Sequence, residues 1–282
     1  MRRTLAQEIA KSGTALHAGA MVEMRLLPAA PGTGIVFRRV DLGGREIPAL
    51  YDRVGETRLG TVIAQDDASV GVIEHLMAAI AGAQIDDLIV TLDGPEPPIL
   101  DGDALSYFRL IEEAGTHEQS GARKAIKVAK PVVTTIKDAQ IRLLPADRPE
   151  YSFDLDYSNT KAVGKQSYAM AFTRENFARE IAPARTFGFM HELDALNKMG
   201  LARGASLTNT IAIDGDIVVN KDLMRFADEF VRHKILDAIG DMALAGGPLI
   251  ARFEGVKSGH ATNNAALRML FADPANYEIV EI

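Results

Sequence analysis

The sequence predicts an α+β fold built from two halves of similar organisation. In each half, segments with the alternating apolar pattern of strands come first, and a strongly helical segment follows. Between the halves lies a stretch of small, polar and charged residues, AGTHEQSGARK, at 114–124. We therefore expect two domains, 1–121 and 122–282, with the boundary near Gly121.

The individual elements follow the same order in both halves. In the first half we expect strands at 22–27 and 34–40, a helix at 70–84, a strand at 88–92 and a helix at 104–113. In the second half we expect strands at 125–136, 140–144 and 151–157, a helix at 227–245 and a strand at 249–253.

The two main helices share a faint likeness. His75 and His233 both lie early in their helices, and Gly82 and Gly240 each follow seven residues later. An internal duplication and chance explain two shared positions equally well.

Composition and charge exclude several classes of protein. The 282 residues are 47% hydrophobic and 24% charged, which is typical of a globular chain and not of a disordered one. A net charge of −7 argues against a protein that binds nucleic acid electrostatically. Because there is no Cys, a metal site would have to be built from His, Asp and Glu.

Nothing in the sequence predicts a membrane span or a secretory signal. The first residues, MRRTLAQEIAKSGTALHAG, contain no uninterrupted apolar segment. The longest apolar run, 242–251, is shorter than the ~18 residues that a span needs. We expect a cytoplasmic protein that works as a monomer.

The helix at 227–245 carries the most informative pattern. His233, Asp237 and Asp241 are spaced by four residues and so lie on one helical face. An imidazole and a carboxylate one turn apart can bind one metal ion, and Asp241 would be a third ligand or would orient a neighbouring His. A single His–Asp pair at this spacing, however, is more often part of a solvent-exposed row of ion pairs on a helix.

Two further clusters favour the metal hypothesis. Glu74 and His75 lie in an apolar helix, where burying both is costly unless they are paired or ligated. His260 follows a Gly-containing turn after a strand, a place where catalytic groups are common. Taken singly, His75 would be a core histidine whose ring nitrogens have hydrogen-bond partners, and His260 would be an ordinary turn residue. Together the clusters indicate a metal-dependent hydrolase, with Glu74 as general base and His260 as general acid.

Seven motifs, spread over nearly the whole chain, point to one known family. They are GTALHAG (13–19), GIVFRR-DL (34–42), VIEHLMAAIAG (72–82), I-D-PEPPILDG (85–102), ARTFGFM (184–190), FADEFVRHKILDAIGD (226–241) and KSGHATNN (257–264). The combination of EFVRHKILDAIGD with a distant EHL is hard to obtain by chance. On these motifs the sequence resembles the UDP-3-O-acyl-N-acetylglucosamine deacetylases, which are zinc amidases of the committed step of lipid A biosynthesis.

The resemblance implies a role for each residue of the expected metal site. His75, His233 and Asp237 would be the zinc ligands. Glu74 would be the general base that takes a proton from the attacking water. His260 would be the general acid or the positive group that faces the oxyanion.

The resemblance also implies roles for the surrounding residues. Asp241 would hydrogen-bond His260 and keep it protonated, and Lys234 would add positive charge near the substrate. The Thr186 hydroxyl would donate to the tetrahedral oxyanion, and Phe187 would border the sugar.

The implied fold has two α+β domains, each a sheet with two helices, and the helices of both are sandwiched between the sheets. A βαβ insert in the second domain, here about 190–219, would line an apolar passage for the acyl chain. The side chains that could line it are Phe189, Leu193, Leu196, Leu201, Leu207 and Ile211, unless they are plain core residues of the insert. Ser206 and Lys257 are further expected substrate contacts.

Several departures from the family pattern concern the substrate and not the chemistry. Ala139 stands where a Lys is expected, with Lys137 as a shifted substitute, and Ser158–Thr160 and Ala205 also differ. The main hypothesis is a zinc-dependent deacetylase acting on the nucleotide-sugar precursor of lipid A. The alternatives are a paralogue that hydrolyses another N-acyl amide, and a binding protein that has lost catalysis.

Overall fold

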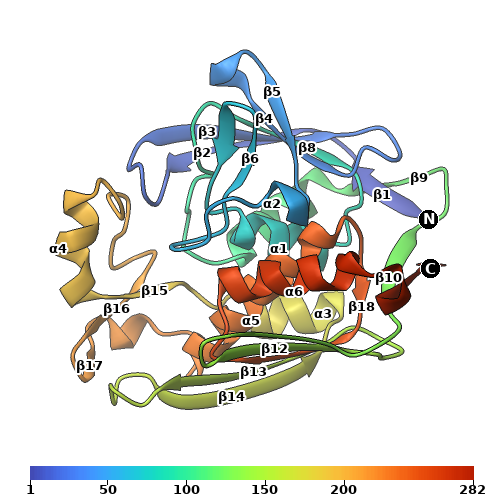
Figure 1. The fold of residues 1–282 in the computed structure, drawn as a ribbon. Helices are drawn as coiled ribbons and strands as arrows, with labels where there is room; N and C mark the ends of the chain where they lie inside the picture. The colour runs from blue at the N-terminus through green and yellow to red at the C-terminus, as the bar shows by residue number, and fades with distance from the viewer.

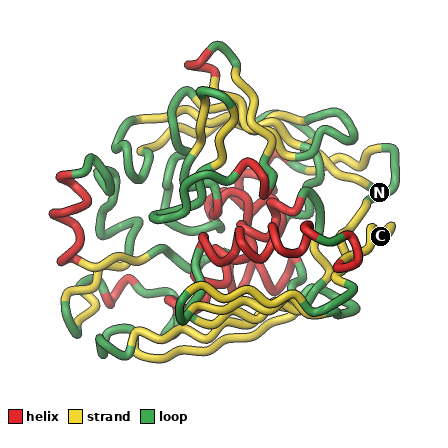
Figure 2. Tube along the Cα trace, in the orientation of Figure 1, coloured by secondary structure: helices red, strands yellow, loops and turns green.

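The computed structural model describes residues 1–282, and its main helices lie in a layer between two five-stranded sheets (Figures 1 and 2). The first sheet has the strand order β2-β3-β8-β4-β5. Its strands are β2 (Ile9–Thr14), β3 (Met21–Pro28), β8 (Leu88–Leu92), β4 (Ile35–Arg39) and β5 (Arg45–Pro48). In β3, residues alternate between exposed and buried, as one-sided burial against the helices requires.

The second sheet repeats the topology of the first. Its order is β11-β12-β19-β13-β14. The strands are β11 (Val132–Ile136), β12 (Ala139–Leu144), β19 (Arg252–Val256), β13 (Glu150–Tyr157) and β14 (Gly164–Ala171). In each sheet the middle strand pairs in parallel with one neighbour and antiparallel with the other, and both outer pairs are antiparallel.

The central layer contains two helices from each half. They are α1 (Glu74–Gly82), α2 (Leu105–Ala114), α5 (Glu229–Met242) and α6 (His260–Ala272). In each half one helix precedes the middle strand and one follows it, so α1 corresponds to α5 and α2 to α6. The matching order favours the duplication over chance, and it places His75 and His233 on corresponding helices.

Smaller elements complete the chain. Strands β1 (Arg2–Leu5) and β9 (Thr116–Gln119) pair with each other, as do β6 (Ile63–Gln65) and β7 (Ala68–Val70). Strand β10 (Lys124–Val128) lies between β18 (Leu249–Ile250) and β20 (Tyr277–Glu281), and a short helix, α3 (Arg174–Asn176), follows β14.

The expected βαβ insert projects from one end of the molecule (Figure 1). It consists of β15 (Phe187–Phe189), α4 (Met190–Lys198) and β16 (Ile211–Asp214), with β15 and β16 parallel. Strand β17 (Ile217–Val218) then pairs antiparallel with β16. Helix α4 has no buried residue, whereas Ile211 and Ile213 of β16 are completely buried and belong to the core.

One hydrophobic core joins the two halves. A single cluster of 57 buried residues contains side chains from both five-stranded sheets and from all four central helices. A protein made of two independent lobes would have two such clusters. The expected α+β fold with sandwiched helices is confirmed, whereas the boundary near Gly121 stays a prediction. None of the helices has the length and apolar character required to cross a bilayer.

Three expected elements differ from the prediction. The expected strand at 125–136 is two strands, β10 and β11, which belong to different sheets. The expected strand at 249–253 is two strands, β18 and β19, which belong to different sheets and meet at the buried Ala251. The expected helix at 227–245 is α5, which ends at Met242 and continues as a 3-10 turn to Ala245. Helix α6 is absent from the element-by-element prediction, because its first turn, HATN, is polar and lacks an apolar repeat.

Candidate metal centre and active site

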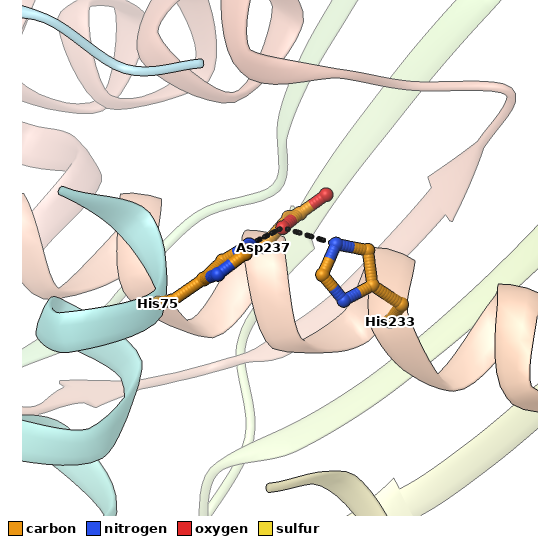
Figure 3. A group of neighbouring side chains, drawn as sticks. All are labelled: His75, His233 and Asp237. Carbon is orange, nitrogen blue, oxygen red and sulfur yellow. Dashed lines mark ion pairs between the residues drawn. The ribbon is translucent and has the colours of Figure 1, made fainter. Parts of the chain in front are cut away.

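Three buried side chains from the two main helices converge on one point (Figure 3). His75 lies on α1, and His233 and Asp237 lie one turn apart on α5. Asp237 Oδ1 is 3.3 Å from His233 Nε2 and 3.7 Å from His75 Nε2. The potential ligand atoms all lie within 4.8 Å of one another, which is the spacing that one shared cation needs.

The protonation of these groups fits a cation between them. The Nδ1 of His233 is 3.1 Å from the Ala184 carbonyl, which can only accept, so Nδ1 carries the proton and Nε2 is a bare acceptor. Burial lowers the pKa of His75 to about 3 and lowers that of His233, so both rings are neutral. A lone pair on His233 therefore faces a carboxylate oxygen at 3.3 Å.

Two buried atoms of the cluster have no hydrogen-bond partner. They are Asp237 Oδ1 and His75 Nδ1. The other oxygen, Asp237 Oδ2, accepts a hydrogen bond of 2.5 Å from Lys234 Nζ. Burial would raise the pKa of Asp237, but His233 and Lys234 outweigh it and hold that pKa well below its usual range. The cluster therefore offers two neutral imidazoles and one ionised carboxylate oxygen, a donor set that suits zinc.

Glu74 lies beside the cluster, at the start of α1. Its Oε2 accepts from the backbone N–H of Thr61 at 2.9 Å, and its Oε1 is 3.8 Å from His260 Nε2. Burial raises the pKa of Glu74 to about 7, although His260 opposes the shift. Glu74 is thus a carboxyl group that gains and releases a proton near neutral pH.

His260, the first residue of α6, is held by a chain of hydrogen bonds. Its Nδ1 donates to Asp241 Oδ2 at 2.8 Å, and Asp241 Oδ1 accepts from Thr61 Oγ1 at 2.5 Å. Asn263 Nδ2 also donates to Asp241 Oδ2, at 2.7 Å. Burial would lower the pKa of His260, but the carboxylates of Asp241 and Glu74 outweigh it and raise the pKa to about 9.

Thr61 and Asn263 belong to this site and were not predicted. Asn263 follows His260 by three residues on α6, so the motif KSGHATNN contained a signal once that segment is known to be helical. Thr61 lies in an irregular loop, 13 residues before Glu74 and 180 before Asp241, and no sequence pattern marks it.

A glycine allows α1 and α5 to approach closely. A Cβ added at Gly240 would lie 2.0 Å from the backbone oxygen of Glu74. This contact brings the helix carrying His233 and Asp237 against the one carrying Glu74 and His75. On α1, a Cβ at Gly82 would lie 2.1 Å from the ring of Phe177. The two shared glycines therefore mark two close helix contacts.

Comparisons with known proteins agree with this geometry. The family model described as LpxC, UDP-3-O-acyl N-acetylglycosamine deacetylase, matches residues 2–272. The chain belongs to this deacetylase family. A UDP-3-O-acyl-N-acetylglucosamine deacetylase of Myxococcus xanthus (strain DK1622) is 46% identical over 280 residues, which cover 99% of this chain and 89% of the relative. The protein is accordingly a hydrolase, and the expected family resemblance is confirmed.

The predicted Phe187 contacts the cluster of His75, His233 and Asp237, and the predicted Thr186 precedes Phe187 in the chain. The ring of Phe187 meets that of His233 edge-on, with 6.2 Å between centroids. Thr186 precedes it and is half-buried, with its backbone N–H bonded to the Gly102 carbonyl at 2.8 Å. Phe189, at the end of β15, packs on Tyr157 with 5.6 Å between ring centroids.

The predicted substrate contacts on the insert are not gathered at the cluster. Ser206 and Leu207 are exposed, and Leu201 is half-buried. Ser206 lines a cavity of about 530 Å³ between residues 99–101 and the insert, and the walls of this cavity include none of the three cluster residues. Ile211 is completely buried in the main core, so it is a core residue of the insert.

Lys257 carries positive charge near the first hairpin of the second sheet. Its Nζ lies 3.4 Å from Asp138 and 3.4 Å from Asp156. These carboxylates raise the pKa of Lys257, which is therefore a cation already paired with two anions. Ala139, where a family Lys is expected, follows Asp138 directly at the start of β12.

The remaining three histidines lie outside the cluster. His117 and His191 are exposed. His17 Nε2 is 3.0 Å from the Leu59 carbonyl, and the Ala202 backbone N–H lies 3.3 Å from His17 Nδ1. His17 thus joins the loop before Thr61 to the segment of the insert between α4 and β16.

Proposed function

We propose that this protein removes the N-acetyl group of UDP-3-O-acyl-N-acetylglucosamine by zinc-dependent hydrolysis, which is a step of lipid A biosynthesis. The observation that supports it best is the buried group of His75, His233 and Asp237 next to Glu74 and His260. The family match over residues 2–272 supports the substrate.

The zinc ligands would be His75 Nε2, His233 Nε2 and Asp237 Oδ1. Two acceptors that face each other at 3.3 Å in a buried site repel unless a cation lies between them. When bound there, zinc would lower the pKa of a water molecule and polarise the amide carbonyl. Lys234 keeps Asp237 Oδ2 occupied and leaves Oδ1 free for the metal.

Glu74 and His260 divide the proton transfers. The Glu74 carboxylate takes a proton from the attacking water, which adds to the acetamide carbon. His260 is protonated at neutral pH because its pKa is about 9, so its Nε2 gives a proton to the departing amine. Asp241 holds the other nitrogen of the ring and sustains that charge.

The developing oxyanion is met by Thr186. Its hydroxyl would donate to this oxygen, and a preorganised donor of this kind contributes about 3 kcal/mol to transition-state stabilisation. Lys234 adds positive charge close by. Phe187 borders the sugar, and Phe189 with Leu201 and Leu207 would guide the acyl chain along the insert, where Ser206 is a polar contact.

All these groups come from one chain, so a monomer contains a complete site. The substrate is a small molecule, and Lys257 would contact the charged, nucleotide end of that molecule. The pairing of Lys257 with Asp138 and Asp156 instead favours a second candidate, a paralogue that hydrolyses a different N-acyl amide.

An assay of acetate release tests the function. Zinc-loaded protein is expected to release acetate from UDP-3-O-acyl-N-acetylglucosamine, and a chelator should abolish the release. Glu74→Gln should keep its zinc, measured by elemental analysis, and lose roughly 10²–10⁴-fold in turnover, because the general base is removed. Glu112→Gln, an exposed change on α2, serves as the control.

Each contrary result has a distinct meaning. A zinc-bound protein without turnover on this substrate, but active on another N-acyl amide, would support the paralogue. Unchanged turnover in Glu74→Gln would contradict the assignment of the base.

A further inference from the structure

Arg185 and Glu229 form a buried ion pair, Glu229 lies one turn before the candidate metal ligand His233 on α5, and no step of the proposed reaction uses this pair. Arg185 and Glu229 have side chains that are 4% and 0% exposed. Burying two charges is costly, and such a pair is no reliable source of stability. Its presence beside a metal ligand therefore calls for a role other than stability.

The contacts of Glu229 show what the pair holds in place. Glu229 Oε1 accepts from both the backbone N–H and the Nε of Arg185, each at 3.0 Å. Glu229 Oε2 accepts from the backbone N–H of Arg225 at 2.6 Å, and the Arg185 guanidinium also donates to the Leu223 carbonyl. One carboxylate at the start of α5 therefore fixes the backbone at residue 185.

Residue 185 has functional neighbours on both sides. The Ala184 carbonyl accepts the proton of His233 Nδ1 at 3.1 Å, which leaves Nε2 as the ligand atom. Thr186 on the other side is held at its own backbone by Gly102 and by Ile211, both at 2.8 Å. His233 lies one turn after Glu229 on the same helix, so the carboxylate and the ring share a rigid base.

We propose that the Arg185–Glu229 pair is a positioning device that aims two groups at the metal centre. It holds the Ala184 carbonyl against His233, which sets the tautomer and orientation of the ring, and it places Thr186 beside the cluster. The His233 part concerns metal binding alone. The Thr186 part rests on the proposed function.

Substituting Glu229 by Gln tests the device. An amide has one acceptor oxygen where the carboxylate has two, so the donors of Arg185 and Arg225 can no longer all be satisfied. Loss of such an outer contact weakens metal binding roughly 10–100-fold. We expect that loss of zinc affinity in a competition titration with a chelator, and a fall in kcat with little change in KM.

The imidazole nitrogens give a readout that stability alone would not move. In ¹⁵N spectra of the wild-type protein without zinc, the His233 signals should show a proton on Nδ1. In Glu229→Gln the Nε2–H tautomer should appear. The matched control is Asp228→Asn, which removes the carboxylate charge from the neighbouring 2.6 Å contact with Arg232 Nε and should change neither zinc affinity nor tautomer.

A double substitution separates positioning from stability. Arg185→Met with Glu229→Met removes both charges together and leaves no unpaired buried charge, so the thermal stability should be higher than that of Glu229→Gln. The backbone N–H of residue 185 would still lack its acceptor, so zinc affinity should remain low. Zinc affinity that recovers together with stability, or that is unchanged in Glu229→Gln, would overturn the proposal. A wild-type protein that binds zinc tightly without deacetylating would contradict the proposed function and leave the metal-binding result intact.

Discussion

At the scale of single residues, two acid–base groups of the site have raised pKa values, for different reasons. Burial dominates at Glu74 and raises its pKa to about 7. At His260 burial alone would lower the pKa, but the carboxylates of Asp241 and Glu74 outweigh it and raise the pKa to about 9. Between these values an ionised Glu74 and a protonated His260 coexist, which is the state that hydrolysis requires.

Replacing Asp241 by Asn should shift the pH dependence of the enzyme. Asp241 is the leading cause that raises the pKa of His260, so a neutral amide lets that pKa fall. His260 then loses its proton at lower pH, and the alkaline limb of kcat/KM moves toward neutral. The measurement is a pH profile of kcat/KM for both proteins, with zinc content as the control. An alkaline limb that stays in place would contradict the role of His260 as the acid.

The sequence contained most of these residues but not their arrangement. The i, i+4 spacing places His233 and Asp237 on one helical face, so their contact was predictable. Thr61 was not, because its bond to Asp241 joins residues 180 apart through the packing of a loop against a helix. The pairing of Lys257 with Asp138 and Asp156 likewise depends on how a hairpin turn meets a neighbouring strand.

At the scale of elements, the site depends on how closely two helices approach. Glu74 and His75 come from α1, and the other two residues of the candidate metal cluster, His233 and Asp237, come from α5. A Cβ at Gly240 would meet the Glu74 backbone oxygen at 2.0 Å, and a backbone atom cannot rotate away as a side chain can. Gly240 thus fixes the distance between the two halves of the site.

Replacing Gly240 by Ala should therefore damage both stability and metal binding. Overpacking of this kind costs about 1–3 kcal/mol, or roughly 2–4 °C in Tm per kcal/mol for a chain of this size. The separated helices should also bind zinc more weakly. Thermal unfolding and a chelator competition measure the two effects.

Gly55→Ala is the matched control, since no heavy atom lies within 4 Å of the added Cβ and the backbone there has no left-handed φ. It should leave Tm and zinc affinity unchanged. A Gly240→Ala protein that binds zinc like the wild type would show that the close approach is not needed.

Element boundaries were predicted best where one pattern continued without interruption. The apolar spacing gave α1 and α5 within a few residues. It missed α6, because the polar first turn that carries His260 and Asn263 faces the active site and not the core. Functional residues here break the apolar periodicity from which helices are recognised.

At the scale of the whole molecule, the two halves share one core and together supply the cluster of His75, His233 and Asp237. The repeated sheet order places α1 and α5 in corresponding positions, each before the middle strand of its sheet. The repeat could be suspected from His75, Gly82, His233 and Gly240, but it became clear only from strand pairing between distant segments. A ligand set drawn from both halves means that metal binding should link them.

Zinc should consequently stabilise the entire fold and not the site alone. A ligand that binds only the folded state stabilises it by roughly 4 kcal/mol at a concentration 1,000 times its Kd, so Tm should rise with zinc and fall with a chelator. Removing His75 leaves the first half without a ligand, so the Tm of His75→Ala should respond little to zinc. In His117→Ala, which removes an exposed histidine outside the cluster, Tm should rise with zinc as it does in the wild type. Calorimetry distinguishes the outcomes: one unfolding transition that moves with zinc is expected from a shared core, whereas a shift confined to one of two transitions would mean that the metal holds one half only.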